Sequence, residues 1–397
     1  MIALDVKIRK EDIKVSSAIK QSFHHPIVFY LLNKDSFYLC SFVILDFQNE
    51  EIKYVETFSE TNVELIKNEY GAAILKDPPH SVMTITKNKF INMIYPIISK
   101  VNNTVRIVDL EKGKMEIYSP TDFGHDHLGR VNETATRDPD DPNSFYICFT
   151  RKDEQSTEYY KFSSDLLKNE FLFDDQGIFK KSPHQIARCK NYILSTGFGE
   201  EEGKILVYDI RSKDISIIST IAKTSHLEIS GNIVYYASNN IKIEGAQVKF
   251  MGPARIGKLK VEENEIVQQG EFWNESGFRF TSHKILNPDV LVTFGFPNRM
   301  FFIDSTSMEM MFYYDIDKQI IPDIDQLHFL NEEYPQTLTD PFRYTALEVS
   351  DDGKYIIFFN QTHIRFFNYY SRRIEFEIPY KISKNHFQLS HHCDFLR

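Results

Sequence analysis

Four histidines of this 397-residue chain share one local pattern. Each follows Pro or Ser and begins an apolar segment that is typical of a β-strand. The four segments are PPHSVMTITKNKF, SPHQIARCKNYIL, TSHLEISGNIVYY and TSHKILNPDVLVT, and their histidines are His80, His184, His226 and His283. Imidazole is a common ligand of Fe, Cu, Ni and Zn. If the fold brings these side chains to one point, they would form a transition-metal site.

The element that must position them is a repeated β-hairpin. An apolar strand, a short polar turn and a second apolar strand recur along the chain, most clearly over 104–119, 204–219, 300–314 and 364–378. The residues that end the first strand of each of seven copies are Asp46, Asp109, Ser163, Asp209, Val261, Asp304 and Asn368. These residues are 43 to 64 positions apart, and a four-stranded propeller blade takes about 40–50 residues, more with long loops.

The repeat therefore predicts an all-β fold, a seven-bladed β-propeller with four-stranded blades, as a single domain over 1–397. The regular period disfavours a pair of sandwiches, and a β-helix is the other all-β alternative. Apart from 60–75, where a helix between blades is expected, amphipathic helices are scarce.

In a propeller the innermost strand of each blade lines the central channel. Upstream of the hairpins, the four histidines fall at the start of the expected inner strands of blades two, four, five and six. Blades three and seven carry no histidine there, and their inner strands are expected near Glu133 and Thr345. His24 and His25 stand at the corresponding place of blade one, as candidates for a fifth axial group.

Four neutral imidazoles on an octahedral ion leave two positions open, where O₂ and substrate can bind. We expect Fe(II), with Cu, Mn and Zn as alternatives. Structural zinc more often includes thiolate, and no cysteine occupies the register of these histidines on the expected inner strands. Two readings without a metal stay open: the histidines are repeat residues that bond within their own blades, or they line a channel used for acid–base chemistry.

The segment SPHQIARCKNYIL, with His184, Asn191 and Tyr192, resembles the stretch around one iron-binding histidine of the carotenoid cleavage oxygenases. That family is a seven-bladed propeller with four axial histidines on a non-haem Fe(II). The resemblance covers about a dozen residues plus the architecture, and the chain is shorter than typical members. It implies an iron-dependent oxygenase that splits or oxidises an alkene with O₂.

Further polar residues accompany the histidines. Glu133 and Glu228 are candidates to accept the second N–H of a bound imidazole. The loop GHDHLGR carries His125, Asp126, His127 and Arg130 and is expected at the channel mouth. The C-terminal HHCDFLR, with His391, His392 and Cys393, is expected to complete the first blade.

Composition limits the partners. The net charge of −10 and the lack of a basic run argue against nucleic acid. No signal-peptide pattern and no apolar run of transmembrane length occur, and the four cysteines are far apart, so a reduced cytoplasmic setting is expected.

These observations predict a metal-dependent oxidoreductase, a dioxygenase that takes O₂ and a small organic substrate in a pocket built by the abundant aromatic residues. Two alternatives belong to other classes: a propeller scaffold that binds proteins without chemistry, and a divalent-metal lyase or hydrolase. The sequence specifies no oligomeric state.

Overall fold

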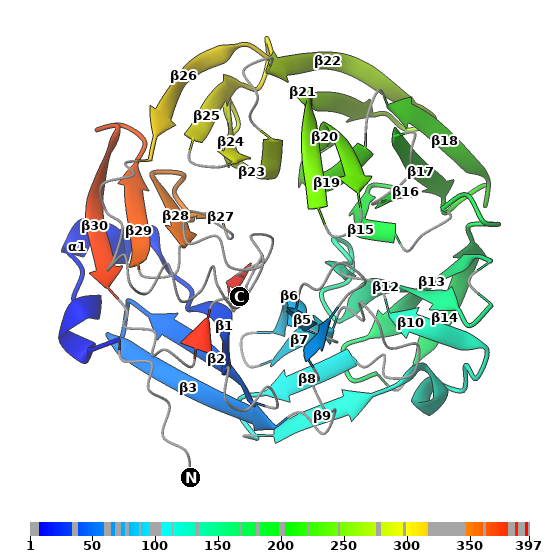
Figure 1. The fold of residues 1–397 in the computed structure, drawn as a ribbon, viewed down its shortest axis with the longest axis horizontal. Coiled ribbons are helices and arrows are strands. Elements are labelled where there is room, and N and C mark those ends of the chain that lie inside the picture. The colour runs from blue at the N-terminus through cyan, green and yellow to red at the C-terminus, as the bar shows by residue number, and fades with distance from the viewer. Residues whose placement is uncertain are drawn as a thin grey trace.

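The computed structural model describes most of the chain between residues 8 and 395. The stretches outside the description, besides both ends, are 34–38, 59–64, 68–72, 76–78, 87–88, 95–104, 113, 132–134, 154, 167, 180–182, 198–202, 221–222, 245–246, 275–278, 297–298, 317–346, 360–362, 380–385 and 388–393. In the described part, seven antiparallel sheets stand around a central axis (Figure 1), so the expected seven-bladed propeller is confirmed.

Each sheet is one blade, and its strands run from the axis outward. Blade one holds β31 (His386–Phe387) and β32 (Asp394–Phe395) inside β1 (Ile27–Asn33), β2 (Leu39–Asp46) and β3 (Glu51–Phe58). Blade two holds β6 (Pro79–Thr86), β7 (Lys89–Ile94), β8 (Val105–Asp109) and β9 (Lys114–Tyr118). Blade three holds β10 (Leu128–Val131) and β11 (Thr136–Arg137) inside β12 (Ser144–Arg151), β13 (Thr157–Ser163) and β14 (Asn169–Asp174).

The other four blades have four strands each. Blade four holds β15 (Pro183–Cys189), β16 (Tyr192–Gly197), β17 (Gly203–Asp209) and β18 (Ile215–Thr220). Blade five holds β19 (Lys223–Ser230), β20 (Ile233–Glu244), β21 (Gln247–Val261) and β22 (Ile266–Asn274). Blade six holds β23 (Arg279–Asn287), β24 (Val290–Phe296), β25 (Arg299–Asp304) and β26 (Met310–Asp315). Blade seven holds β27 (Leu347–Val349), β28 (Tyr355–Phe359), β29 (His363–Asn368) and β30 (Arg373–Pro379).

The seven hairpin residues recognised in the sequence all end the third strand of their blade, counted from the axis. Their side chains explain the turn that follows. The carboxylate of Asp109 accepts the backbone N–H groups of Glu111 and Lys112, and that of Asp304 accepts those of Thr306 and Ser307. A side-chain oxygen that binds the backbone two or three residues on closes a tight turn. The same local bond forms at Asp46, Asp209 and Asn368.

The ring closes in blade one by pairing distant parts of the chain. Strand β1 pairs with β2 on one side and with β31 and β32 on the other. The expectation that the C-terminal segment completes the first blade is therefore confirmed. The expectation that the segment from His24 is an innermost strand is wrong, because the C-terminal strands lie between β1 and the axis. His24 is exposed, and its backbone N–H bonds the Asp351 carboxylate in blade seven.

Each blade buries both of its faces against its neighbours. In β12, Phe145, Ile147 and Phe149 pack with side chains of blade two. The alternate residues Tyr146 and Cys148 pack with blade four. Successive side chains of a strand point to opposite faces, so a strand that is covered on both faces reads as a continuous apolar run rather than an alternating one.

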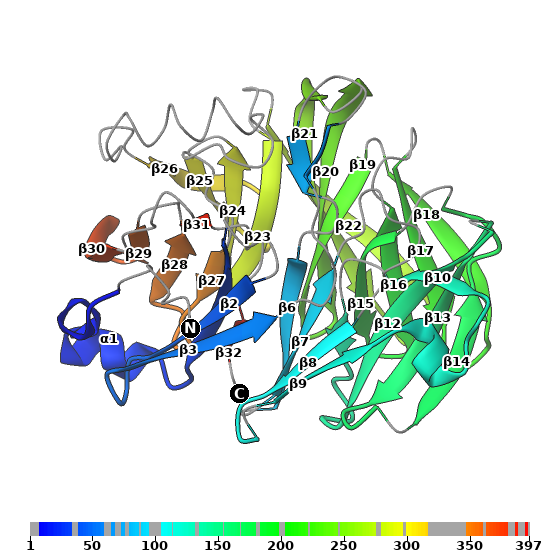
Figure 2. The ribbon, with the colours of Figure 1, turned by 60° about the horizontal axis from the view of Figure 1, so that its bottom comes forward.

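The described residues include three short helices at the edge of the ring: η1 (Lys10–Ile13), α1 (Ser17–Ser22) and η2 (Pro120–Phe123). Figures 1 and 2 both place α1 beside blade seven and blade one, and buried Ile13 and Ile19 join the core of that seam. The helix expected over 60–75 is wrong, since Leu65–Lys67 and Ala73–Leu75 form the hairpin β4–β5. No helix in the described part of the chain has the length and apolar character needed to cross a bilayer.

The seam between blades seven and one depends on Phe366, which is fully buried and packs edge-on against Phe23 and Phe47 at 5.6 and 5.3 Å between ring centroids. We expect Phe366→Ala to lower the free energy of unfolding by about 3–5 kcal/mol, because it opens a cavity in this core. Urea denaturation measures the loss. Tyr370→Ala removes a ring that is 69% exposed and serves as the control. Equal losses in the two variants would contradict this view of the seam.

Candidate functional site

The four histidines lie on the innermost strands of four blades: His80 on β6, His184 on β15, His226 on β19 and His283 on β23. The structure describes the strand positions of all four histidines and the side-chain surroundings of His226 and His283. The strand ladders allow their positions to be compared directly.

The histidines do not share a single register. His80 and His184 each directly follow a proline and fall in a register shift against the second strand, between Pro79 and Ser81 and between Pro183 and Gln185. His226 also lies in a shift. In β23 the shifts lie on either side of His283, one before Ser282 and one after Ile285, and His283 itself is paired with Thr293. An added residue in one strand changes which residues of the two strands are paired, so the ladder position of His283 differs from those of the other three histidines.

His283 is buried, with 3% of its surface exposed. Its Nε2 lies 3.2 Å from the backbone oxygen of Tyr235 in blade five. Since a carbonyl only accepts, Nε2 carries the proton and a neutral ring keeps its lone pair on Nδ1. Nδ1 is buried and has no hydrogen-bond partner within the described part of the chain. Burial lowers the pKa of His283 to about 4, so the imidazole is neutral near neutral pH.

His226 of blade five is the neighbouring imidazole. The ring centroids of His226 and His283 are 6.3 Å apart, with an angle of 86° between the ring planes. With metal–nitrogen bonds of about 2.0–2.1 Å, two imidazoles on one ion have centroids at most about 6.5 Å apart. The observed distance of 6.3 Å is close to this upper limit. Imidazoles at adjacent coordination positions of one ion would have centroids about 1–2 Å closer together than that limit. Within the described residues, no three His, Cys, Asp or Glu side chains are grouped closely enough to hold an ion.

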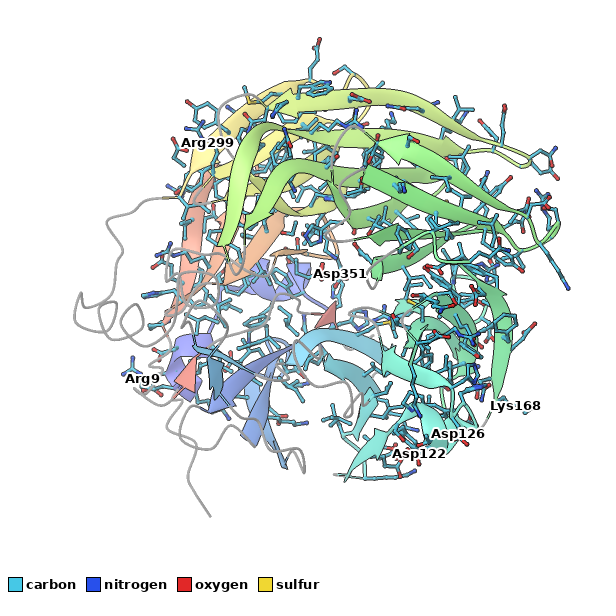
Figure 3. All side chains as sticks on the ribbon, turned by 45° about the vertical axis from the view of Figure 1, so that its right-hand side comes forward. Arg9, Asp122, Asp126, Lys168, Arg299 and Asp351 are labelled. Atoms are coloured by element: carbon cyan, nitrogen blue, oxygen red, sulfur yellow. The ribbon has the colours of Figure 1, made fainter. Side chains whose placement is uncertain are left out.

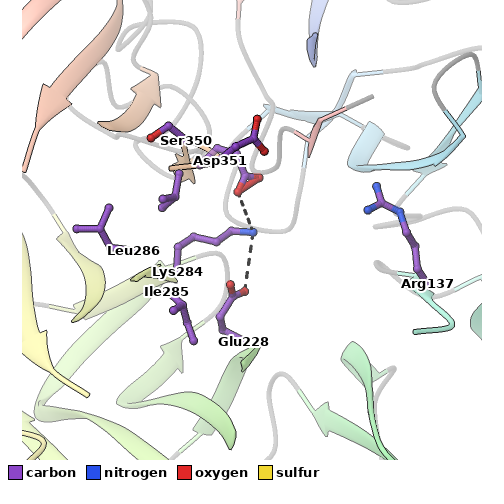
Figure 4. Close-up of a pocket in the computed structure, with 9 residues that line it drawn as sticks. Arg137, Glu228, Lys284, Ile285, Leu286, Ser350 and Asp351 are labelled. Atoms are coloured by element: carbon purple, nitrogen blue, oxygen red, sulfur yellow. Dashed lines mark ion pairs between the residues drawn. The ribbon is translucent and has the colours of Figure 1, made fainter. Parts of the chain in front are cut away.

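A polar cavity of about 460 Å³ lies among the inner strands that include those of His226 and His283 (Figure 4). Its charged lining residues are Arg137, Glu228, Lys284, Glu348 and Asp351, and its other lining residues are Ile285, Leu286, Val349 and Ser350. The expected aromatic pocket is absent from this lining, which has no aromatic residue. The cavity is built by the inner strands of blades three, five, six and seven and by the turn after β27.

Lys284 ties three successive blades together at this cavity. Its Nζ lies 3.2 Å from Glu348 of blade seven and 3.8 Å from Glu228 of blade five. Glu348 is nearly buried, and a buried carboxylate needs a counter-charge. Glu228, which the sequence nominated as a partner of a bound imidazole, is thus placed beside an ammonium group. Arg137 stands across the cavity from Lys284 (Figure 4).

Lys284 and Glu348 were missed in the sequence, although a signal was present. Lys284 directly follows His283, Glu228 comes two residues after His226, and Glu348 interrupts the apolar start of blade seven. A charged residue at the start of an apolar inner strand marks a position that faces the axis or another charge.

Amide side chains fix the inner strands of blades five and six near the histidines. Gln185 of blade four donates to the backbone oxygen of Leu227 and accepts the Leu227 N–H. Asn239 of blade five makes the same pair of bonds with Phe280 of blade six. Each clamp lies beside a register shift, where ladder bonds are interrupted. The amides therefore satisfy backbone groups that the shifts leave unpaired.

His125 and His127 of the GHDHLGR segment bond outer strands, which corrects the expectation that they line the channel mouth, whereas the end of the segment enters the inner strand β10. Nε2 of His125 is 3.0 Å from Asn169 on the outer strand β14, and Nε2 of His127 is 3.0 Å from the buried carboxylate of Glu158. Figure 3 shows Asp126 near Lys168 at the rim of blade three. The two imidazoles therefore bond outer strands and not the axis, and the side chain of Arg130 lies outside the described residues.

Several nominated residues lie outside the described part of the chain: Glu133, Thr345, His391, His392 and Cys393. Glu133 falls between β10 and β11, the two pieces of the inner strand of blade three. His25 is half-buried just before β1 and, like His24, belongs to the second layer from the axis.

The sequence matches no known protein family. It also matches no curated protein. In fold, the chain is similar to the Dos1 propeller, with a TM-score of 0.55 and 11% identity over 91% of this chain and 86% of the other. It is similarly related to a protein from Lactobacillus plantarum, with a TM-score of 0.56 and 9% identity over 94% of this chain and 99% of the other. At such identities the likeness extends to the fold alone.

The buried imidazole of His283 makes stability depend on pH. The unfolded ring binds a proton below its ordinary pKa of about 6.5, whereas the folded ring does so only near 4. Stability is therefore lost as the pH falls from 6.5 to 4, by about 3 kcal/mol from this group. His283→Gln should remove this part of the loss in metal-free protein, measured as the difference between variant and wild-type urea curves across that range.

A matched control exchanges the exposed His24 for Gln and should follow the wild-type profile. Burial raises the pKa of Asp175 to about 6, so its protonation adds stability as the pH falls, opposite to the effect of His283. Because Asp175 is present in every variant, the difference between the variant and wild-type curves isolates the contribution of His283. A His283→Gln profile parallel to that of the wild type would contradict the assignment.

Lys284→Met should destabilise the protein by about 1–3 kcal/mol, because it leaves Glu228 and Glu348 without their ammonium partner. Lys284→Arg keeps the charge and should lose less. Combining Lys284→Met with Glu348→Gln should recover part of the loss, since one stranded charge is removed. Chemical denaturation of the four proteins tests this, and a double variant weaker than Lys284→Met would refute it.

Proposed function

We propose that this propeller is a metal-dependent enzyme, a non-haem Fe(II) oxygenase that acts on a small organic substrate in the axial cavity. The observation that carries the proposal is the state of His283: a buried, neutral imidazole with Nε2 directed at a backbone oxygen and Nδ1 without a partner in the described structure. A metal-binding histidine commonly bonds a carbonyl or carboxylate through its other ring nitrogen. The local resemblance around His184 to carotenoid cleavage oxygenases supports the choice of iron.

The ion would be held by the four inner-strand histidines, His80, His184, His226 and His283. Iron bound there would supply Lewis acidity and redox chemistry with O₂. The protein's own part is to hold neutral ligands and to position the substrate. Tyr235 fixes the tautomer of His283, and Gln185 and Asn239 fix the strands that carry or neighbour the histidines.

The cavity supports a polar substrate. Lys284 shares β23 with His283, and Glu228 shares β19 with His226, so the charged lining and two of the proposed ligands come from the same inner strands. This lining suits an organic molecule with charged groups better than a long apolar alkene.

A second candidate, a protein-binding scaffold, is favoured by the outer strands of blades five and six. Trp273 of β22 and Met310, Met311 and Tyr313 of β26 are each more than 40% exposed. Arg299 covers the Tyr313 ring at 3.9 Å from its centroid, and Figure 3 places Arg299 on the outer edge of the ring. Exposed aromatic and methionine side chains are enriched at protein interfaces.

Elemental analysis of protein purified without added metal tests the first candidate. We expect stoichiometric iron that is lost in His184→Ala and in His283→Ala. His363→Ala, on the third strand of blade seven, is the control and should keep the metal. Oxygen consumption with candidate substrates then tests the oxygenase assignment.

Two results would decide against this function. Metal-free protein whose stability is unchanged in alanine variants of all four histidines would leave the scaffold as the better account. Bound metal without oxygen consumption would favour a lyase or hydrolase.

A further inference from the structure

Two histidines at the rim of blade three lie close to each other and away from the axis. His125 and His127 flank Asp126 in the turn between η2 and β10. Their ring centroids are 6.0 Å apart, with an angle of 89° between the ring planes. Both rings bond side chains of the outer strands β13 and β14, and neither lines the axial cavity. The pair therefore has to be considered separately from the four axial histidines.

Hydrogen bonds fix the same tautomer in both rings. Nε2 of His127 lies 3.0 and 3.1 Å from the two oxygens of the Glu158 carboxylate, and Nε2 of His125 lies 3.0 Å from Oδ1 of Asn169. These oxygens only accept hydrogen bonds, so each Nε2 carries a proton and each neutral ring keeps its lone pair on Nδ1. Within the described part of the chain, neither Nδ1 has a hydrogen-bond partner.

The carboxylate behind His127 has the arrangement of the outer partner of a metal-bound imidazole. Glu158 is only 5% exposed. Tyr160 donates to it at 2.6 Å, and a guanidinium nitrogen of Arg151 lies 3.4 Å away. A metal-bound histidine commonly donates its other N–H to a carboxylate, which orients the ring and makes the ligating nitrogen more basic. The turn thus carries two oriented imidazoles whose Nδ1 atoms can act as ligands.

We propose that His125 and His127 bind one divalent transition-metal ion through their Nδ1 atoms, at a site distinct from the axis. Imidazole favours Zn²⁺, Cu²⁺ and Ni²⁺, whereas Mg²⁺ and Ca²⁺ prefer oxygen ligands. No third His, Cys, Asp or Glu of the described residues is placed to join the pair, so water fills the other coordination positions. The proposal does not depend on the proposed oxygenase function.

The distance between the rings is compatible with one shared ion after a small movement. Two imidazoles at adjacent positions of one ion have centroids about 4.5–5.5 Å apart, given metal–nitrogen bonds of about 2.0–2.1 Å. The rings therefore have to approach each other by about 1 Å. The side chain of His127 is 47% exposed, so solvent and not a packed core surrounds the ring that has to rotate.

Calorimetric titration of chelator-treated protein with ZnCl₂ tests the site. His127→Gln keeps a group that can bond Glu158 but removes the imidazole, and it should weaken zinc binding at this site at least tenfold. His125→Ala should have the same effect. Asn169→Ala and Glu158→Gln leave both imidazoles in place and change only the groups that orient them, so each should weaken binding about tenfold.

His24→Gln removes an exposed histidine elsewhere and is the control, which should bind zinc as the wild type does. His184→Ala separates this site from the axial one, because the binding event that depends on His127 should persist in that variant. It should persist whether or not the axial histidines hold iron. Absence of zinc binding, or equal affinity and stoichiometry in the wild type, His125→Ala and His127→Gln, would overturn the inference.

Discussion

Each sheet of this ring is covered on both faces, by the preceding blade on one side and the next blade on the other. Phe145 and Tyr146 are adjacent in β12 and belong to different cores. No blade can bury its apolar surface alone, so stability depends on contacts around the whole ring. The geometry of the axis follows, because the inner strands are held where the packed faces meet. The site at the axis is thus a product of the packing at every seam.

The turns could be predicted from the sequence because the hydrogen bonds that close them join residues close together in the chain. Asp109 and Asp304 bond backbone groups two or three residues on, so their spacing disclosed the blades. Ring closure was half readable: the C-terminal segment was expected in blade one, but β1 was taken for its innermost strand. The position of β1 in the blade depends on its pairing with residues more than 350 positions away. No local sequence pattern near His24 indicates that pairing. The segment over 60–75 misled for a related reason, since short apolar runs suit both helix and strand.

The site was only partly readable. Strand positions of the histidines followed from the repeat, but orientation depends on register shifts, which have no sequence signature at Thr224 or Phe280. Two of the charged residues of the cavity lie beside the histidines in the sequence. The charged side chains come together in space only because three blades pack around the axis. Lys284 acquires its role from Glu228 and Glu348, which come from neighbouring sheets.

The pairing of β1 with β31 and β32 has a consequence for synthesis. Strand β1 is made more than 350 residues before β31 and β32, and its inner edge lacks these partners until they emerge. During that interval blade one exposes backbone groups that any other extended segment can bind. The nascent protein is thus open to aggregation at this edge throughout the interval, and a chaperone that shields one strand edge would protect it.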